Sequence, residues 1–186
     1  MPKSAQPDKI KGKNIILRKI RLSDVTDIYK KFHKSEILKW TLFQPPKNYS
    51  IEDQKQWIKK TLSKTKAHKA YVFGITLSHQ DKIIGIASLE KFNWKNKNAQ
   101  IGYWLTKKHW GKGIMPQTVK LILNFAFKKL KLHRVYGAVF ADNIPSQKVL
   151  EKCGFTKEGI TRHATYRYNR WHDKIRYGIL AQEFKK

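Results

Sequence analysis

The sequence lacks several features that mark other classes of protein. With one cysteine, Cys153, among 186 residues, the chain can form no internal disulfide, which excludes a small secreted disulfide scaffold. The seven histidines show no metal-ligand spacing and no Cys-x-x-Cys pair occurs, so we expect no metal site. No apolar run reaches the roughly 18 to 20 residues of a membrane span, and the N-terminal residues show no apolar core of a signal peptide. We therefore expect a cytoplasmic protein that neither binds a metal nor enters a membrane.

Acidic residues are also scarce. The chain carries 13 Asp and Glu against 40 Lys and Arg, which gives a formal net charge of +27 and a pI of about 10.2. Such a field attracts phosphate-bearing partners, among them phosphorylated coenzymes and ribosomal RNA. Because the lysines are scattered rather than clustered, the charge is also typical of a solvated surface in a lysine-biased proteome. Composition leaves both interpretations of the charge open.

Apolar and aromatic residues are plentiful enough for a folded core. The chain has six Trp, eight Tyr and nine Phe, and 40% of it is hydrophobic, which suits one domain of this length. Residues 1–13 differ from the rest, because two prolines and four lysines lie in a polar stretch that predicts a mobile basic tail. We therefore expect a single domain over residues 14–186, as a monomer or a homodimer.

Hydrophobic periodicity predicts alternating strands and helices along that domain. Residues 14–22 alternate as a strand, and Ser23 is placed to cap the amphipathic helix that follows. Ser50 is placed to cap a second helix, from Ile51 to about Lys66. Further strands are expected over 71–77, 82–91, 99–106, 134–141, 156–168 and 172–184, and further helices over 114–130 and 144–153. There is no internal repeat and no second domain.

The most informative stretch is residues 108–113, with the sequence Lys-His-Trp-Gly-Lys-Gly. Gly111 and Gly113 can adopt positive φ without strain, so successive backbone amides can converge on one anion. A β-rich segment precedes the loop, and an amphipathic helix follows it with Pro116 in the first turn, where proline is tolerated. The free amides and the positive end of the helix dipole then face the same point. An ordinary glycine turn between a strand and a helix explains the loop equally well.

A second motif follows at residues 142–155, after a strand-like run. It contains Asn143 and Ser146 at the start of a predicted helix and Gly154-Phe155 at its end. The glycine loop resembles the Arg/Gln-x-x-Gly-x-Gly/Ala coenzyme motif of the GNAT N-acetyltransferase superfamily, with Lys108 where the family usually has Arg or Gln. The later stretch resembles the superfamily's Asn-x-x-Ser/Ala helix that ends in Gly-Phe. With Ile101-Gly-Tyr-Trp-Leu105 before the loop, the likeness narrows to the RimJ/RimL-like branch and covers the chain from about Asn14.

The resemblance implies a fold, a co-substrate and a set of coenzyme contacts. The fold is α/β (α+β), a single domain with a mixed, strongly twisted sheet of about six to seven strands flanked by helices. The co-substrate is acetyl-CoA, with no metal. Its implied contacts in this sequence are Trp104, Leu105, Thr106, Lys108, His109, Trp110, Gly111, Lys112, Gly113, Ile114, Asn143 and Ser146.

Acetyl transfer needs a group that removes a proton from the amine and a group that protonates the departing thiolate. The family position at the end of the third strand makes Glu90 the candidate base, although the position suits an ordinary surface residue equally well. Gln100 stands where relatives often carry Glu, which removes another candidate carboxylate. Many relatives place a tyrosine that serves as the general acid where this chain has Leu150. The resemblance to RimL-like enzymes therefore makes Ser146 the candidate acid. Helix capping is the alternative role for Ser146.

The sequence says less about the acceptor. Trp40 and Phe43, in an aromatic and proline-rich connection over residues 39–48, are either walls of an acceptor pocket or simple packing. The expected C-terminal hairpin carries basic and aromatic side chains that suit an acceptor, an RNA contact or a solvated strand face, namely Arg162, Arg167, Arg170 and Trp171.

The resemblance predicts acetyl transfer to a primary amine by direct attack in a ternary complex. The first expectation for the acceptor is the α-amine of a protein N-terminus, as on a ribosomal protein. A small-molecule amine such as a polyamine, an amino sugar or an antibiotic is the alternative, although a net charge of +27 repels polycations. A second alternative is a GNAT-fold protein that binds RNA or the ribosome without catalysis.

Overall fold

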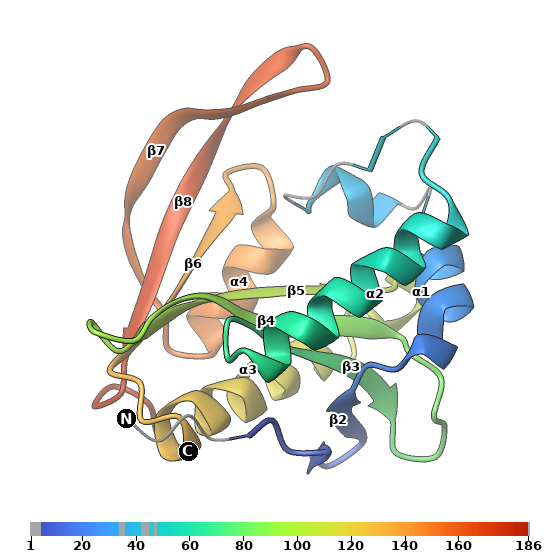
Figure 1. Ribbon diagram of the computed structural model, residues 1–186. Coiled ribbons are helices and arrows are strands. Elements are labelled where there is room, and N and C mark those ends of the chain that lie inside the picture. The colour runs from blue at the N-terminus through green and yellow to red at the C-terminus, as the bar shows by residue number, and fades with distance from the viewer. Residues whose placement is uncertain (1–4, 34–35, 42–44, 47, 186) are drawn as a thin grey trace.

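The computed structural model describes residues 5–33, 36–41, 45–46 and 48–185, which form one α/β domain around an eight-stranded mixed sheet. The strands are β1 (Lys9–Lys11), β2 (Ile15–Lys19), β3 (Tyr71–Leu77), β4 (Gly85–Asn93), β5 (Asn98–Leu105), β6 (Arg134–Phe140), β7 (Thr156–Arg167) and β8 (Arg170–Leu180). Their spatial order is β1-β2-β3-β4-β5-β6-β8-β7 (Figure 1). The predicted fold class is confirmed, with slightly more strands than expected.

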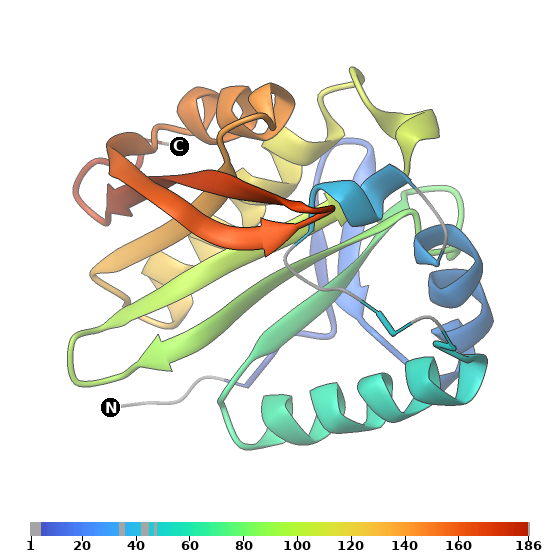
Figure 2. The ribbon, with the colours of Figure 1, turned by 90° about the horizontal axis from the view of Figure 1, so that it is seen from above.

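Helices cover both faces of the sheet (Figure 2). One face carries α1 (Val25–Phe32) and α2 (Ile51–Lys66), and the other carries α3 (Ile114–Asn124) and α4 (Ile144–Lys152). Three short 3₁₀ turns, η1 (Leu22–Asp24), η2 (Glu36–Lys39) and η3 (Lys107–His109), lie between these elements, and a π-helical turn, η4 (Phe125–Lys129), extends α3. The apolar side chains whose helical spacing predicted α3 form its buried face, and Val119, Ile122 and Leu123 are fully enclosed.

The sheet opens between β5 and β6, which are the one parallel pair of strands in the part of the chain that the structure describes. These strands pair only through residues 98–100 and 134–136. Beyond that point β5 continues along β4 as far as Leu105, while β6 continues along β8 as far as Phe140. The two halves of the sheet therefore separate on the side where both strands lead into the helices α3 and α4, and this opening positions the site described below.

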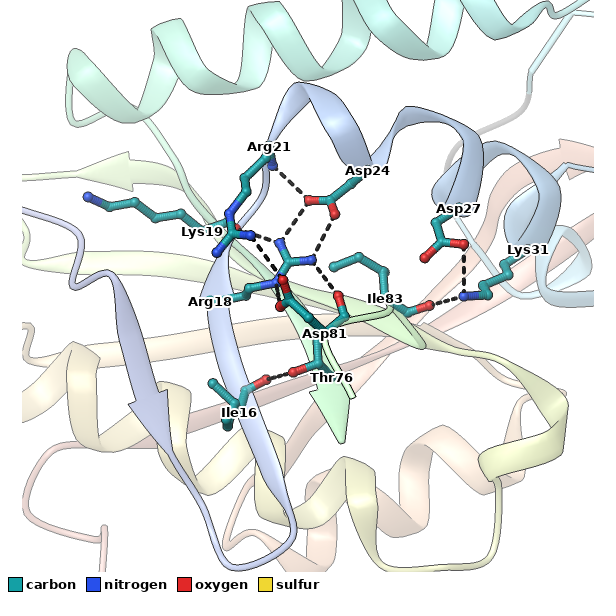
Figure 3. A network of polar contacts seen from close by, with 10 residues as sticks. All are labelled: Ile16, Arg18, Lys19, Arg21, Asp24, Asp27, Lys31, Thr76, Asp81 and Ile83. Carbon is teal, nitrogen blue, oxygen red and sulfur yellow. Dashed lines mark hydrogen bonds and ion pairs between the residues drawn. The ribbon is translucent and has the colours of Figure 1, made fainter. Parts of the chain in front are cut away.

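A buried arginine ties the N-terminal elements together (Figure 3). The Arg18 guanidinium, with only 2% of its side chain exposed, makes a bidentate ion pair with Asp24, at 2.7 and 2.8 Å. It also contacts the carboxylate and the carbonyl of Asp81, at 2.5 and 2.8 Å, and the carbonyl of Lys19, at 3.0 Å. All five N–H donors of the guanidinium therefore have an acceptor, which is the condition for burying this charge.

Two local predictions were wrong. Part of the expected mobile tail is structured, since β1 pairs with β2 and the buried Gln6 side chain donates to the carbonyl of Val72 at 2.7 Å. Ser23 does not cap the first helix, because it lies inside η1 and Asp24 occupies the cap position of α1. The second cap is confirmed, since Ser50 Oγ accepts the amide of Asp53 at 3.2 Å and Asp53 returns a bond to the Ser50 amide.

Candidate active site

A cleft of about 910 Å³ occupies the opening between β5 and β6. Its lining comes from the glycine loop before α3, from α4, from β4, and from the side of the sheet that carries α1, η2 and α2. The cleft therefore connects the two faces of the sheet. Two reactants that enter from opposite faces can meet in it.

The glycine loop has the geometry of an anion cradle. Gly111 and Gly113 both have φ of 71°, and Gly113 caps α3 with a left-handed backbone. Apart from their chain neighbours, no described heavy atom lies within 4 Å of where a Cβ on either glycine would stand. The first backbone bond into the helix is donated by Gln117 to the Gly113 carbonyl, at 3.2 Å, so the amides of Ile114 and Met115 precede the helical ladder. These amides and the helix dipole favour a bound anion.

Contacts behind the loop hold it in place. Thr106 Oγ1 lies 2.7 Å from His109 Nδ1, and the Trp110 indole donates to the carbonyl of Leu105 at 2.7 Å. Lys107 Nζ reaches Glu36 at 2.6 Å and so connects the loop to η2. Burial, together with the charges of Lys112 and Lys108, lowers the pKa of His109 below its usual 6.5. The loop therefore presents a neutral imidazole in a positive field at neutral pH.

Most of the predicted coenzyme contacts border the cleft. The lining includes Trp104, Leu105, His109, Trp110, Gly111, Lys112, Gly113, Ile114, Asn143 and Ser146. Thr106 and Lys108 do not line it; Thr106 supports His109 from behind, and Lys108 is exposed. Trp104 borders the cleft from the face of α1, where its ring packs on Phe32 with centroids 5.2 Å apart.

Asn143 and Ser146 stand at the start of α4. Asn143 is the cap residue, and its Oδ1 accepts the Ser146 amide at 3.2 Å. Ser146 is not itself the cap, so its hydroxyl is available for another contact. Ser146 Oγ lies 2.9 Å from the hydroxyl of Tyr103, a residue of β5 that also lines the cleft.

Tyr103 was not among the predicted site residues, because the strand pattern places it on one face of β5 but does not place it beside Ser146. Ile101, Tyr103 and Leu105 alternate along β5 and belong to the core cluster on the face of α3 and α4. Lys148 and Lys152 were also missed, and both line the cleft from α4. Their spacing of four residues places them on one face of that helix, which is a pattern the sequence displays.

Glu90 lies at the exposed end of β4, opposite Gln100 of β5, and both residues line the cleft. The pairing of β4 with β5 becomes irregular immediately after Glu90, where Lys91 adopts a φ of 50°. Among the described residues that line the cleft, Glu90 is the one carboxylate, against Lys91, Lys112, Lys148 and Lys152. The cleft as a whole is therefore cationic.

The opposite end of the cleft is aromatic. Trp40, with 38% of its surface exposed, lines the cleft together with the more enclosed Tyr49 and Trp57. Phe43 lies outside the described residues. The predicted basic group of the hairpin divides in two: Arg167 is buried and donates to the carbonyls of Leu38 and Thr41, whereas Arg162, Arg170 and Trp171 are exposed.

Other chemistry finds no support in the described part of the chain. No group of His, Cys, Asp or Glu there could hold a metal ion, and no helix there is long and apolar enough to cross a membrane. Burial raises the pKa of the Cys153 thiol to about 11, and Cys153 Sγ contacts the carbonyl of Pro116 at 3.5 Å. Cys153 is therefore a buried structural residue and an unreactive thiol at neutral pH.

Comparisons with known proteins agree with this geometry. A family model described as "Acetyltransferase (GNAT) domain" matches residues 14–156. A Bacillus subtilis (strain 168) protein, "Probable N-acetyltransferase YjcK", is 34% identical over 174 residues, 92% of this chain and 96% of that protein.

Two solved structures share the fold over nearly the whole chain. The ribosomal-protein-S5-alanine acetyltransferase from Vibrio fischeri superposes with a TM-score of 0.84 and 27% identity, over 96% of this chain and 99% of that one. The microcin C7 self immunity acetyltransferase MccE, in complex with acetyl-CoA and AMP, superposes with a TM-score of 0.84 and 26% identity, over 95% and 98% of the two chains. The chain therefore belongs to the GNAT acetyltransferase family, and it is an N-acetyltransferase of that type.

Proposed function

We propose that the protein transfers acetyl from acetyl-CoA to a primary amine and binds the coenzyme diphosphate at residues 111–113. The observation that carries the proposal is the pair of left-handed glycines that opens α3 at the edge of the cleft. The space above both glycines is open, and the amides of Ile114 and Met115 have no place in the helical ladder. These residues fit a phosphorylated coenzyme, with Lys112, Lys148 and Lys152 nearby to offset its charge.

The chemistry divides between two groups that line the cleft. Acetyl-CoA supplies an acetyl thioester. The acceptor nitrogen forms a bond to the acetyl carbon as the carbon–sulfur bond breaks, and overall the nitrogen loses one proton while the sulfur gains one. We assign proton removal to the Glu90 carboxylate, directly or through water, and donation to sulfur to the Ser146 hydroxyl. Most of the rate gain comes from holding the two substrates together in the cleft.

The two assignments are tested by Glu90→Gln and Ser146→Ala. Each variant keeps the size of the side chain close to that of the original and is expected to lower kcat by about a hundredfold or more, the usual contribution of acid–base catalysis. The Kd for acetyl-CoA should change by less than about threefold. Unchanged turnover in either variant contradicts the role assigned to that residue.

For the acceptor we propose the α-amine of a protein N-terminus, on a ribosomal protein in the cytoplasm. The similarity to the Vibrio fischeri ribosomal-protein-S5-alanine acetyltransferase supports this choice. The charge of the cleft supports it as well, because Glu90 is the one carboxylate against four lysines in the described lining. A polyamine needs several carboxylates to offset its charges, whereas a peptide N-terminus brings a single amine.

A small-molecule amine is the second candidate acceptor. It is favoured by the similarity to the self immunity acetyltransferase MccE and by the aromatic end of the cleft, where Trp40, Tyr49 and Trp57 offer apolar surface. Rings in such a pocket hold a flat or apolar ligand.

RNA or ribosome contact is a separate proposal, supported by the C-terminal hairpin. Tyr166 and Trp171 are opposite each other on β7 and β8, with 57% and 56% of their surfaces exposed, and the His163 ring stacks on Trp171 at 5.8 Å. Six Lys and Arg against two acidic residues lie in residues 156–180. Exposed rings in a basic surrounding suit stacking on single-stranded RNA.

The first experiment adds acetyl-CoA to the protein and measures both thermal stability and thiol release with amines. Saturation at a hundred times the Kd stabilises the fold by about 2.7 kcal/mol. Labelled acetyl-CoA in host lysate, followed by separation into protein, small-molecule and RNA fractions, then identifies the acceptor class. Counts in protein support the N-terminal acceptor, and counts in small molecules support the second candidate. No stabilisation together with no thiol release contradicts the proposed enzyme.

A further inference from the structure

We propose that Tyr103 is a positioning residue that turns the hydroxyl hydrogen of Ser146 into the cleft. The inference rests on the proposed function, in which Ser146 donates to the coenzyme sulfur. It adds no chemical step. It states what determines the direction in which Ser146 donates.

The two hydroxyls come from different elements and meet at the opening of the sheet. Tyr103 is on β5, paired with Ala87 of β4, and its ring packs against the core on the face of α3 and α4. Ser146 is in the first turn of α4, where Asn143 Oδ1 accepts its amide. Both side chains line the cleft. A strand and a capped helix turn therefore hold the pair from opposite sides.

The distances favour one arrangement of the two hydrogens. Tyr103 has a single hydroxyl hydrogen and two oxygens in reach, Ser146 Oγ at 2.9 Å and the Ser146 carbonyl at 3.3 Å. Hydroxyl hydrogen bonds between oxygens fall at about 2.5 to 3.0 Å, so only the contact with Oγ has normal length. If Tyr103 donates to Oγ, the serine hydrogen is free to point elsewhere. In the reverse arrangement Ser146 donates its hydroxyl hydrogen to the Tyr103 oxygen, and the Tyr103 hydrogen can reach only the Ser146 carbonyl, at 3.3 Å.

Tyr103 acts as a hydrogen-bond donor rather than as the source of the proton. Burial raises the pKa of Tyr103 above the ordinary value of 10.0, so the phenol keeps its hydrogen at neutral pH. The contact of normal length joins its hydroxyl to Ser146 Oγ, at 2.9 Å. The geometry therefore assigns Tyr103 to holding Ser146 Oγ from behind.

The position of Tyr103 also accounts for a departure from the family pattern. Leu150 lies one turn after Ser146 on α4 and is fully buried. The resemblance predicts a tyrosine that serves as the general acid at this position. In this chain the phenol approaches the same helix from β5 instead. A tyrosine hydroxyl is therefore present at the opening, but it acts through Ser146.

Tyr103→Phe removes the hydroxyl and keeps the ring. The expected result is a fall of about tenfold in kcat, which is the usual effect of losing one hydrogen bond, with an unchanged KM for acetyl-CoA. The double variant Tyr103→Phe/Ser146→Ala should be no slower than Ser146→Ala alone, because Tyr103 acts only through Ser146. Tyr177→Phe is the matched control: it removes another tyrosine bond to α4, to Glu151 at 2.8 Å, five residues after Ser146. The control should retain wild-type kcat.

Several outcomes overturn the inference. Losses that add in the double variant mean that Tyr103 acts independently of Ser146, and an equal fall in Tyr177→Phe means that only packing on α4 matters. An increase in KM without a fall in kcat assigns Tyr103 to binding. If the wild-type protein releases no thiol with any amine, the proposed function fails and this inference fails with it, whereas normal turnover with an inert Tyr103→Phe contradicts this inference alone.

A second variant keeps the test valid if Tyr103→Phe does not fold. Replacing Tyr103 with 3-fluorotyrosine retains the hydroxyl and lowers the phenol pKa. A positioning residue still donates to Ser146 Oγ, so kcat is expected to stay within about twofold of wild type, with an unchanged alkaline limb of the pH profile. A shift of that limb to lower pH shows that Tyr103 gives up its proton and overturns the positioning role.

Discussion

At the scale of single residues, Arg18 shows how this strongly basic chain places one charge in its core. Arg18 occupies a buried position in β2, and its partners come from η1 and from the turn between β3 and β4 (Figure 3). The ion pair with Asp24 is almost fully enclosed, with 2% and 8% of the side chains exposed. Arg18 therefore links three elements, and removal of Asp24 leaves a buried charge without its main partner.

Asp24→Asn is expected to lower the free energy of unfolding by about 3 kcal/mol, because the variant breaks the buried pair while Asp81 still holds Arg18. Urea denaturation measures the change. Asp27→Asn is the control, because Asp27 pairs with Lys31 at a half-exposed site, 3.3 Å apart, and its loss should cost less than about 0.5 kcal/mol. Equal effects in the two variants contradict a special role for Arg18.

The pKa of His109 is sensitive to the positive electrostatic field of the lysines in the glycine loop. Because burial and the neighbouring lysines lower its pKa from 6.5, the unfolded chain takes up this proton first as pH falls. The contribution to stability is thus complete above pH 6.5 and is lost between 6.5 and the lower pKa of the folded state. NMR titration of the imidazole should give a midpoint below 6.5, and Lys112→Ala should raise it. Acetyl-CoA should raise it too, since phosphates offset the lysine field. A midpoint that coenzyme leaves unchanged contradicts phosphate binding beside His109.

At the scale of elements, the loop before α3 is expected to bind through its backbone. Gly113→Ala places a Cβ on a residue with φ of 71°, which costs about 1 to 2 kcal/mol and displaces the first amides of α3. The Kd for acetyl-CoA should rise about tenfold, measured by calorimetry. Lys112→Ala leaves the backbone intact and removes only an exposed charge, so the Kd should rise by less than about fivefold. A larger effect of Lys112→Ala assigns binding to the side chain instead.

The sequence predicted elements whose cause is local. The stripe of α3, the Ser50 cap and the left-handed glycines depend on neighbours along the chain, and each is present in the structure. β1 was missed because a polar three-residue strand forms only by pairing with β2. Tyr103 was missed for the same kind of reason, since its partner Ser146 lies 43 residues away and only the fold brings the two together. The motifs located the site, and the tertiary contacts supply its polar network.

At the scale of the whole molecule, the net charge of +27 has to be separated from its local arrangement. Several of the basic side chains have structural partners, such as Arg134 with Glu158 and Arg170 with Asp142. The β7–β8 hairpin, by contrast, extends beyond α4 in Figure 1 and ends in a turn at Tyr168 and Asn169, both with positive φ. Arg167 anchors this hairpin to η2 while the rings of Tyr166 and Trp171 remain exposed.

This arrangement predicts two kinds of loss in RNA binding. Trp171→Ala should weaken binding of single-stranded RNA by about tenfold at every salt concentration, because stacking on one ring contributes about 1 to 3 kcal/mol per base. Arg162→Ala, which removes an exposed charge of the same hairpin, should reduce the slope of log K against log salt by about one phosphate contact. Lys59→Ala on the exposed face of α2 should change neither quantity. If all three variants lose affinity equally, RNA is attracted by the net charge of the whole protein, and the hairpin is a solvated strand face.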